Sequence, residues 1–403
     1  MRKMFLVFLT ILTSVDAWAQ RTIVSGTVVC GETGNVIASA SVTAAGVAVV
    51  TNDDGLFTLK TDTAVEAVTV SHVGYRSRRV SLKDGQLENL TVKLVPTSVQ
   101  LSEVLVMADN PRELVMAAIR KIPQNYSRQP QLYNCFYRET AMKRQHYICV
   151  SEGVVDMYKT SYQQGTGRDR VAIRKGRRLL SPKRNDTLSV KVMGGPVASV
   201  QLDLVKNTDF LLNADDLDCY DLKMETPTSI GDRQQFVVSI RPRVTMDYAL
   251  YFGKLYIDQE TQAFTRAELS LDMSDREKAT RLMLVRKPTG VRFRPKELSL
   301  LVDYRFVDGV TLISYVRTTF RFNCDWKRRL FATSFTACCE MAVTSSTDHD
   351  VQPIRGRESF DQRDAFFDRV DYFRDPAFWQ DYNIIEPTES LDKAIDKLIK
   401  KYD

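Results

Sequence analysis

The sequence predicts a mainly β protein: a small N-terminal β-sandwich, a larger antiparallel β-sheet domain, a connecting helix and a helical C-terminal tail. Two patterns support this prediction. Short β-branched runs separated by Gly, Asn and Asp come first, and longer alternating runs joined by hairpin turns follow. The 403 residues suffice for two domains with separate cores. The expected ranges are a signal peptide at 1–19, the sandwich at 20–96, a linker strand and helix at 97–125, the sheet domain at 126–350 and the tail at 351–403.

The N-terminal segment predicts export. Arg2 and Lys3 precede an apolar run that is too short to span a bilayer, and Ala17-Trp18-Ala19 places small residues before a cleavage point after Ala19. No later stretch stays apolar over the roughly 20 residues that a membrane-spanning helix needs. We therefore expect a mature protein without a transmembrane span, in the periplasm or at the periplasmic face of the outer membrane.

Residues 21–96 predict about seven short strands with turns between them. Asp54-Gly55 marks a turn in which Gly can take a positive φ, and Phe57 restarts the alternation after it. Gly74-Tyr75 follows a later β-branched run. This spacing of strands and turns is typical of a small antiparallel sandwich.

Several motifs in this region resemble the carboxypeptidase-regulatory-like domain, a transthyretin-like or immunoglobulin-like β-sandwich that precedes many larger envelope proteins. They are Gly26-Thr27-Val28, the run at 51–59 and the run at 70–75. The fold-motif positions are Gly26, Asp54, Gly55, Phe57, Gly74 and Tyr75. The same module extends TonB-dependent receptors, but the residues after 106 are too few for a plug and a barrel. The resemblance implies a fold and names no activity.

The linker combines an extended run with a helix. Residues 98–106 read as an interdomain strand, and addition to the sheet edge of a partner is the alternative. Asn110 is the expected cap of the following helix, Pro111 suits its first position, and Pro123 is expected to end it.

Sequential hairpins predict a single meandering sheet at 126–350, with Asp308-Gly309 as one of its turns. Cys135 and Cys149 flank another hairpin and form a candidate disulfide. They face each other only if the hairpin loop has an odd number of residues. Because the exported chain has seven Cys, at least one is expected to be unpaired.

Two features bear on the sheet domain and the tail. Gly253-Lys254-Leu255-Tyr256-Ile257-Asp258 with Thr261 is similar to a hairpin of periplasmic lipoprotein carriers, in which a curved half-barrel holds lipid. Aromatic residues recur at helical spacing after Pro353, and we expect them to dock on the sheet as a stripe.

The net charge of +6 originates in one segment. Residues 168–184 contain eight Lys and Arg against one Asp, so the rest of the mature chain is slightly acidic. The candidate anion-binding patch is Arg174, Lys175, Arg177 and Arg178. An anionic lipid or acidic glycan fits this charge, and a solvated hairpin is the alternative. Nucleic acid is not an expected partner of an exported protein.

The residue inventory does not match the familiar enzyme motifs. None of the three His has a Glu three residues later, as a zinc carboxypeptidase needs, and HExxH, GxSxG, P-loop and GxGxxG motifs are absent from the sequence. We therefore expect no catalytic residues, no cofactor and no metal site. A carboxylate pair assembled from distant segments, as in glycosidases, stays open.

The sequence thus predicts a non-catalytic exported binding or scaffolding module, with an envelope protein, an anionic lipid or a glycan as its partner. One alternative is a periplasmic carrier that holds a lipid or other apolar ligand in a curved β-sheet. The other is a hydrolase with an unrecognised carboxylate pair. Sequence patterns leave the ligand, the cysteine pairing and the oligomeric state open.

Overall fold

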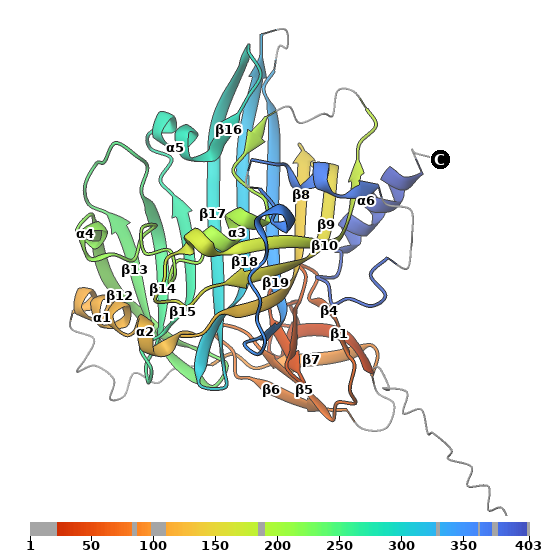
Figure 1. Ribbon diagram of the computed structural model, residues 1–403, viewed down its shortest axis with the longest axis vertical. Coiled ribbons are helices and arrows are strands. Elements are labelled where there is room, and N and C mark those ends of the chain that lie inside the picture. The colour runs from red at the N-terminus through yellow and green to blue at the C-terminus, as the bar shows by residue number, and fades with distance from the viewer. Residues whose placement is uncertain are drawn as a thin grey trace, which may run out of the picture.

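The computed structural model describes residues 22–82, 87–97, 110–183, 190–327, 331–361, 363–372 and 378–400. The signal peptide expected at 1–19 and the extended run at 98–106 lie outside the described residues. The predicted fold class is confirmed, because a small β-sandwich lies at one end of a large sheet and helices flank that sheet (Figure 1).

Seven short strands form the sandwich. The three-stranded sheet has the order β4 (Leu56–Thr61), β1 (Thr22–Cys30), β7 (Leu90–Leu94), and the four-stranded sheet has the order β3 (Val47–Val50), β2 (Ser41–Ala44), β5 (Ala67–Ser71), β6 (Arg78–Ser81). Alternate apolar residues such as Val24, Phe57 and Val70 fill the space between the sheets. The expected all-antiparallel arrangement is corrected at β7, which pairs parallel to β1.

Two glycines of the fold motif are required by the backbone. A Cβ at Gly26 would lie 2.3 Å from the carbonyl oxygen of Leu90, so the parallel pairing of β1 and β7 needs a residue without a side chain. Gly55 has a φ of +75°, which closes the turn before β4. Gly74 also has a positive φ, and Tyr75 beside it forms a bridge to Pro96.

The large sheet has eleven strands, and neighbouring strands are antiparallel except for the last pair. Its order is β12 (Tyr220–Ile230), β13 (Arg233–Pro242), β14 (Tyr251–Asp258), β15 (Phe264–Leu271), β17 (Val291–Val307), β18 (Val310–Trp326), β19 (Thr333–Thr347), β8 (Gln131–Lys143), β9 (His146–Lys159), β10 (Arg170–Leu180) and β20 (Asp371–Tyr372).

This order corrects the expected simple meander. The first hairpin, β8–β9, leaves the free edge of β8 to be paired by β19, which comes much later in the chain. The hairpin turn predicted at Asp308-Gly309 is confirmed between β17 and β18. Both of its residues have a positive φ, of +48° and +88°.

Short helices pack against the large sheet. They are α1 (Pro111–Arg120), α2 (Ile122–Asn125), α3 (Pro196–Gln201), α4 (Ala214–Leu217), α5 (Arg276–Met283) and α6 (Glu389–Ile399), and a two-stranded sheet joins β11 (Lys191–Val192) to β16 (Leu284–Arg286). The side chain of Asn110 caps α1 by accepting from two backbone N–H groups, as the sequence predicts. Pro123 does not end the helical segment, because α2 begins directly after Lys121.

The apolar face of the sheet is covered by the chain itself. Leu114 and Val115 of α1, Val200 of α3 and Leu217 of α4 belong to the same buried cluster as the inward residues of the strands. Figure 1 shows α3 lying across this face. The surface that would shelter an apolar ligand in the carrier interpretation is therefore filled by the helices.

The tail reaches the sheet in a less regular form than expected. Between 351 and 372 its described elements are two 3₁₀ turns (Gly356–Glu358 and Phe366–Arg369) and the short β20, and α6 follows near its end. Phe360 and Phe366 join the core, and Phe366 packs edge-on against Tyr137. The described Phe360 and Phe366 thus dock on the sheet, but the aromatic residues that the structure describes in this tail lie outside α-helices and do not form a helical stripe.

Candidate ligand-binding cleft

The candidate disulfide is contradicted by the strand register. Cys135 on β8 pairs with Val155, and Cys149 on β9 pairs with Ala141. A six-residue offset along a strand separates the two thiols by about 20 Å. The hairpin closes through a two-residue loop, whereas the two cysteines could face each other only across a loop with an odd number of residues. All seven cysteines are free, and burial raises the pKa of Cys149 to about 12.

The candidate anion-binding patch lies on β10, where Arg177 has an internal partner. Its Nε donates to Glu152 Oε2 at 2.7 Å, and its guanidinium lies over the Trp379 ring, 5.1 Å from the centroid. Arg138 Nε donates to the other Glu152 oxygen at 2.8 Å, and Trp379 Nε1 donates to Oε2 at 3.0 Å. Burial alone would raise the pKa of Glu152, but the two arginines lower it to about 2.

The other three residues of the predicted patch also have partners. Lys175 Nζ donates to the Phe378 carbonyl at 2.8 Å and lies 4.1 Å from the centroid of that ring. Arg178 donates to a carbonyl oxygen of the tail, and Arg174 pairs with Asp156 while remaining 60% exposed. Lys175 and Arg178 thus hold the tail against β10, and Arg174 and Arg177 pair with carboxylates of β9. Anion binding by this patch stays a prediction.

A second ionic cluster is fully buried behind the large sheet. Lys159 Nζ lies 2.9 Å from Asp203 and 3.4 Å from Asp169, and Lys206 Nζ lies 2.6 Å from Asp169. The Tyr304 hydroxyl donates to Asp203 at 2.9 Å. Burial and the charge of Lys159 lower the pKa of Lys206 to about 8. The cluster ties separate segments together, and its four charged side chains are out of reach of a ligand because they are at most 1% exposed.

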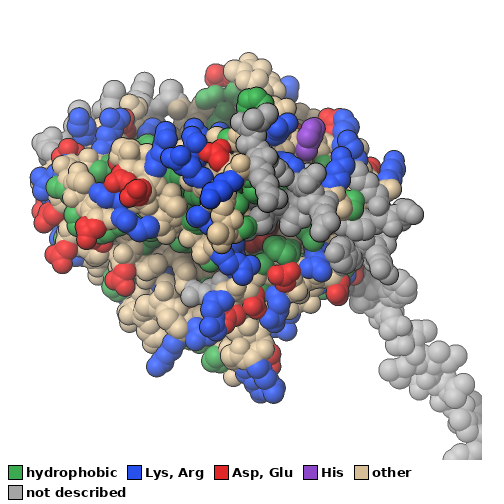
Figure 2. Space-filling view, turned by 90° about the horizontal axis from the view of Figure 1, so that it is seen from above, with side chains coloured by type: hydrophobic (Ala, Val, Ile, Leu, Met, Phe, Trp, Pro, Cys, Tyr) green, Lys and Arg blue, Asp and Glu red, His purple; other side chains and the backbone are tan. Residues whose placement is uncertain are grey.

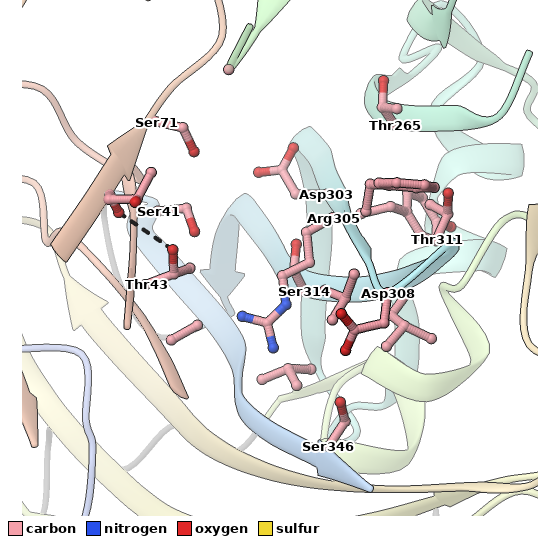
Figure 3. A pocket seen from close by; sticks show the side chains of 18 of the residues that line it. Ser41, Thr43, Ser71, Thr265, Asp303, Arg305, Asp308, Thr311, Ser314 and Ser346 are labelled. Atoms are coloured by element: carbon pink, nitrogen blue, oxygen red, sulfur yellow. Dashed lines mark hydrogen bonds between the residues drawn. The ribbon is translucent and has the colours of Figure 1, made fainter. Parts of the chain in front are cut away.

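A cleft of about 1290 Å³ separates the sandwich from the large sheet (Figure 3). One wall is the outer face of the four-stranded sheet of the sandwich. Ser41 pairs with Ser71 and Thr43 with Thr69, so four small hydroxyl residues form a compact array on this face. Because such side chains are short, the face stays open and presents donors and acceptors to the cleft.

The opposite wall is the end of the β17–β18 hairpin. Figure 3 shows Asp303, Arg305, Asp308, Thr311 and Ser314 around the cleft, on the side facing the sandwich. The register shifts by one residue opposite the Asp303–Tyr304 step and leaves Ser314 without a cross-strand partner. Such a bulge re-aims side chains and often accompanies a binding site.

Two ion pairs occupy carboxylates of the cleft. Arg233 donates to both oxygens of Asp258, each at 2.7 Å. Arg266 Nη1 lies 3.0 and 3.1 Å from the two oxygens of Asp303. Burial raises the pKa of Asp303, and Arg266 opposes this shift. Asp258 also accepts from the backbone N–H and hydroxyl of Thr261, which explains the Asp-x-x-Thr spacing as a turn.

The walls are joined through the turn before β4. Asp53 forms two hydrogen bonds to Arg317 of β18, at 2.7 and 3.1 Å. Asp54, a fold-motif residue, accepts from the backbone N–H of Glu389 at 2.7 Å, and Asn52 donates to the Pro387 carbonyl at 2.9 Å. These contacts hold the sandwich against both the sheet and the tail. The sequence predicts this turn as part of the sandwich alone, because nothing in its residues indicates partners more than 250 positions away.

Charges of both signs are interspersed on the surface. On the face seen in Figure 2, Lys and Arg side chains are scattered with Asp and Glu side chains between them. In the described part of the chain, no helix has the length and apolar composition needed to cross a membrane. The same residues contain no cluster of three or more His, Cys, Asp or Glu suited to hold a metal ion.

Comparison with known proteins places the N-terminal module. Residues 24–106 match the CarboxypepD_reg-like domain family, which confirms the resemblance for this module. No curated protein sequence matches the chain. One similar crystal structure is a DUF1329 family protein from Desulfovibrio piger ATCC 29098, with 12% identity and a TM-score of 0.24 over 60% of this chain and 95% of that one.

A second crystal structure is a protein of unknown function from Bacteroides fragilis NCTC 9343, thought to be membrane-associated. It is 9% identical, with a TM-score of 0.16, and the match covers 81% of this chain and 98% of that one. TM-scores this low establish no shared overall fold.

Proposed function

We propose that this protein is a non-catalytic binding module of the cell envelope whose cleft holds a hydrophilic oligosaccharide. The observation that carries the proposal is the lining of the 1290 Å³ cleft, to which both β domains contribute hydroxyl and charged side chains. Pockets for small molecules are usually smaller, at roughly 300–1,000 Å³, so the size of this cleft suits an extended ligand. Hydroxyl, amide and carboxylate groups provide the donors and acceptors that sugar hydroxyls need.

The form of the sandwich wall favours a sugar over a peptide strand. An extended peptide binds by adding to an exposed sheet edge, where backbone groups are unpaired. The array of Ser41, Thr43, Thr69 and Ser71 is a sheet face, where side chains make the contacts. A ligand rich in hydroxyl groups matches such a face.

Two carboxylates of the cleft, Asp258 and Asp303, favour binding over catalysis. A glycosidase needs one carboxyl group that can deliver a proton and a second carboxylate across the scissile bond. Asp258 and Asp303 are instead each paired with an arginine. The carrier alternative loses support because the apolar face of the sheet is covered by helices. Export, which the sequence predicts, would place the cleft among cell-envelope glycans.

A glycan-array screen followed by calorimetry tests this function. We expect the wild type to bind at least one oligosaccharide, and Thr43→Arg, which fills the cleft, to weaken that binding at least tenfold. Thr58→Arg is the matched control, because Thr58 is a β4 residue outside the cleft lining. Absence of binding to every glycan, or equal binding by Thr43→Arg, would refute the proposal. Hydrolysed products in mass spectra would refute its non-catalytic part.

A further inference from the structure

Arg305 is a cation in the cleft that the protein leaves without a partner. It lies on β17 opposite Leu312, and its guanidinium extends into the space between the two walls (Figure 3). It is half-buried and forms no hydrogen bond or ion pair with any described residue. Its Nε atom is buried without an acceptor.

The neighbouring arginines show how unusual this arrangement is. Arg233 is paired with Asp258 and Arg266 with Asp303, whereas no described carboxylate forms an ion pair with Arg305. The bond to Asp258 raises the pKa of Arg233, whereas burial lowers the pKa of Arg305. A half-buried guanidinium without a counterion is unfavourable in the free protein, and a bound anion would relieve that cost.

We propose that Arg305 receives the carboxylate of an acidic oligosaccharide, one that contains uronic acid residues; this inference rests on the proposed function of the cleft. A guanidinium presents parallel N–H donors that match the two oxygens of a carboxylate. A monoanion suits this wall better than a phosphate, because Asp303 and Asp308 flank Arg305 in sequence and line the same cleft. Ser314, which is half-buried at the bulge, is placed to contact the sugar hydroxyls.

Paired probes that differ in charge alone test this role. The probes are tetramers of galacturonate, mannuronate and hyaluronan, each with its carboxyl-methyl ester, and calorimetry gives the Kd values. We expect the wild type to bind at least one acid at least tenfold more tightly than its ester. Arg305→Gln is expected to bind that acid and ester equally, at the affinity of the wild type for the ester. Arg305→Lys is expected to retain part of the preference.

A matched variant and a stability measurement separate a loss of the Arg305 contact from a loss of folding. Arg241→Gln removes an exposed arginine of β13 outside the cleft lining and is expected to keep the full preference for the acid. Thermal unfolding of each variant shows that it is folded, and if Arg305→Gln does not fold, the Lys variant decides. Equal binding of acid and ester by the wild type, or an unchanged preference in the folded variant, would overturn the role of Arg305 and leave the glycan proposal standing. Failure of both acids and esters to bind would overturn this role as well, while a neutral hit on the array would still uphold the proposed function.

Discussion

Arg177 on β10 and Arg305 on β17 are both largely withdrawn from solvent, yet their surroundings differ. Arg177 belongs to a segment crowded with cations, and Glu152 and the Trp379 ring neutralise it. Arg305 stands in an ordinary alternating strand, where the nearby Asp303 is paired with Arg266. The density of charge in the sequence thus marks where the fold uses ion pairs for its own stability. Arg305, which has no carboxylate partner among the described residues, keeps its guanidinium available to a ligand.

The largest effect is expected from removing the charge of Glu152. Glu152→Gln would leave Arg138 and Arg177 buried with a weaker acceptor, and breaking a buried ion pair from one side costs about 3–5 kcal/mol. Urea denaturation should show this loss in the free energy of unfolding. The matched variant is Arg305→Gln, which removes a charge that has no partner and should change that free energy by less than about 1 kcal/mol. Equal losses in both variants would abolish the distinction between the two regions.

The second largest effect is expected from acid, which should lower the free energy of unfolding through Glu152 and not through Arg305. The pKa of Glu152 is about 2 in the folded protein, below its ordinary value of 4.5. Its stabilising contribution is therefore complete above pH 4.5 and is lost as the pH falls toward 2, by about 3 kcal/mol in all. Urea melts across this range should show the loss in the wild type and in Arg305→Gln, and a much smaller one in Glu152→Gln. The same slope in all three proteins would assign the acid sensitivity to other groups.

Trp379→Phe should give the smallest loss. The phenyl ring keeps an aromatic contact with Phe136 but lacks the N–H that donates to Glu152. Loss of one hydrogen bond to a buried charge predicts a decrease of about 2 kcal/mol in the free energy of unfolding. Thermal unfolding at neutral pH measures it, with Phe378→Leu as a control for ring packing. No change in Trp379→Phe would mean that water replaces the indole donor.

Much of the fold could be predicted from local pattern. The sandwich follows from turn residues and alternation, the cap of α1 from Asn110, and the β17–β18 turn from Asp308-Gly309, because each depends on residues close in sequence. The pairing of β19 with β8 and the contacts of Asp53 and Asp54 depend on segments far apart, and no local signal encodes them.

The candidate site was harder to predict for the same reason. A run of cations such as 168–184 is conspicuous in a sequence, but its partners belong to the tail and to β9. Arg305 has no motif, and what sets it apart is that Asp303 and Asp258 pair with other arginines. Whether a charge is available depends on packing, which one sequence does not display.

The contacts between the turn before β4 and the tail also affect the order in which the domains assemble and the consequence of a proteolytic cut. The bond from Asn52 to the Pro387 carbonyl spans 335 positions. The sandwich can fold early from local pairings, and its attachment to the sheet is complete after Pro387 and Glu389 have been synthesised, because long-range contacts form late. A protease that cut the chain shortly before Pro387 would leave the strands of both domains intact. It would weaken the attachment of the sandwich to the tail through Asn52 and Asp54. Ligand binding would then weaken without unfolding of either domain, because the hydrogen bonds between Arg317 and Asp53 would still join the two walls.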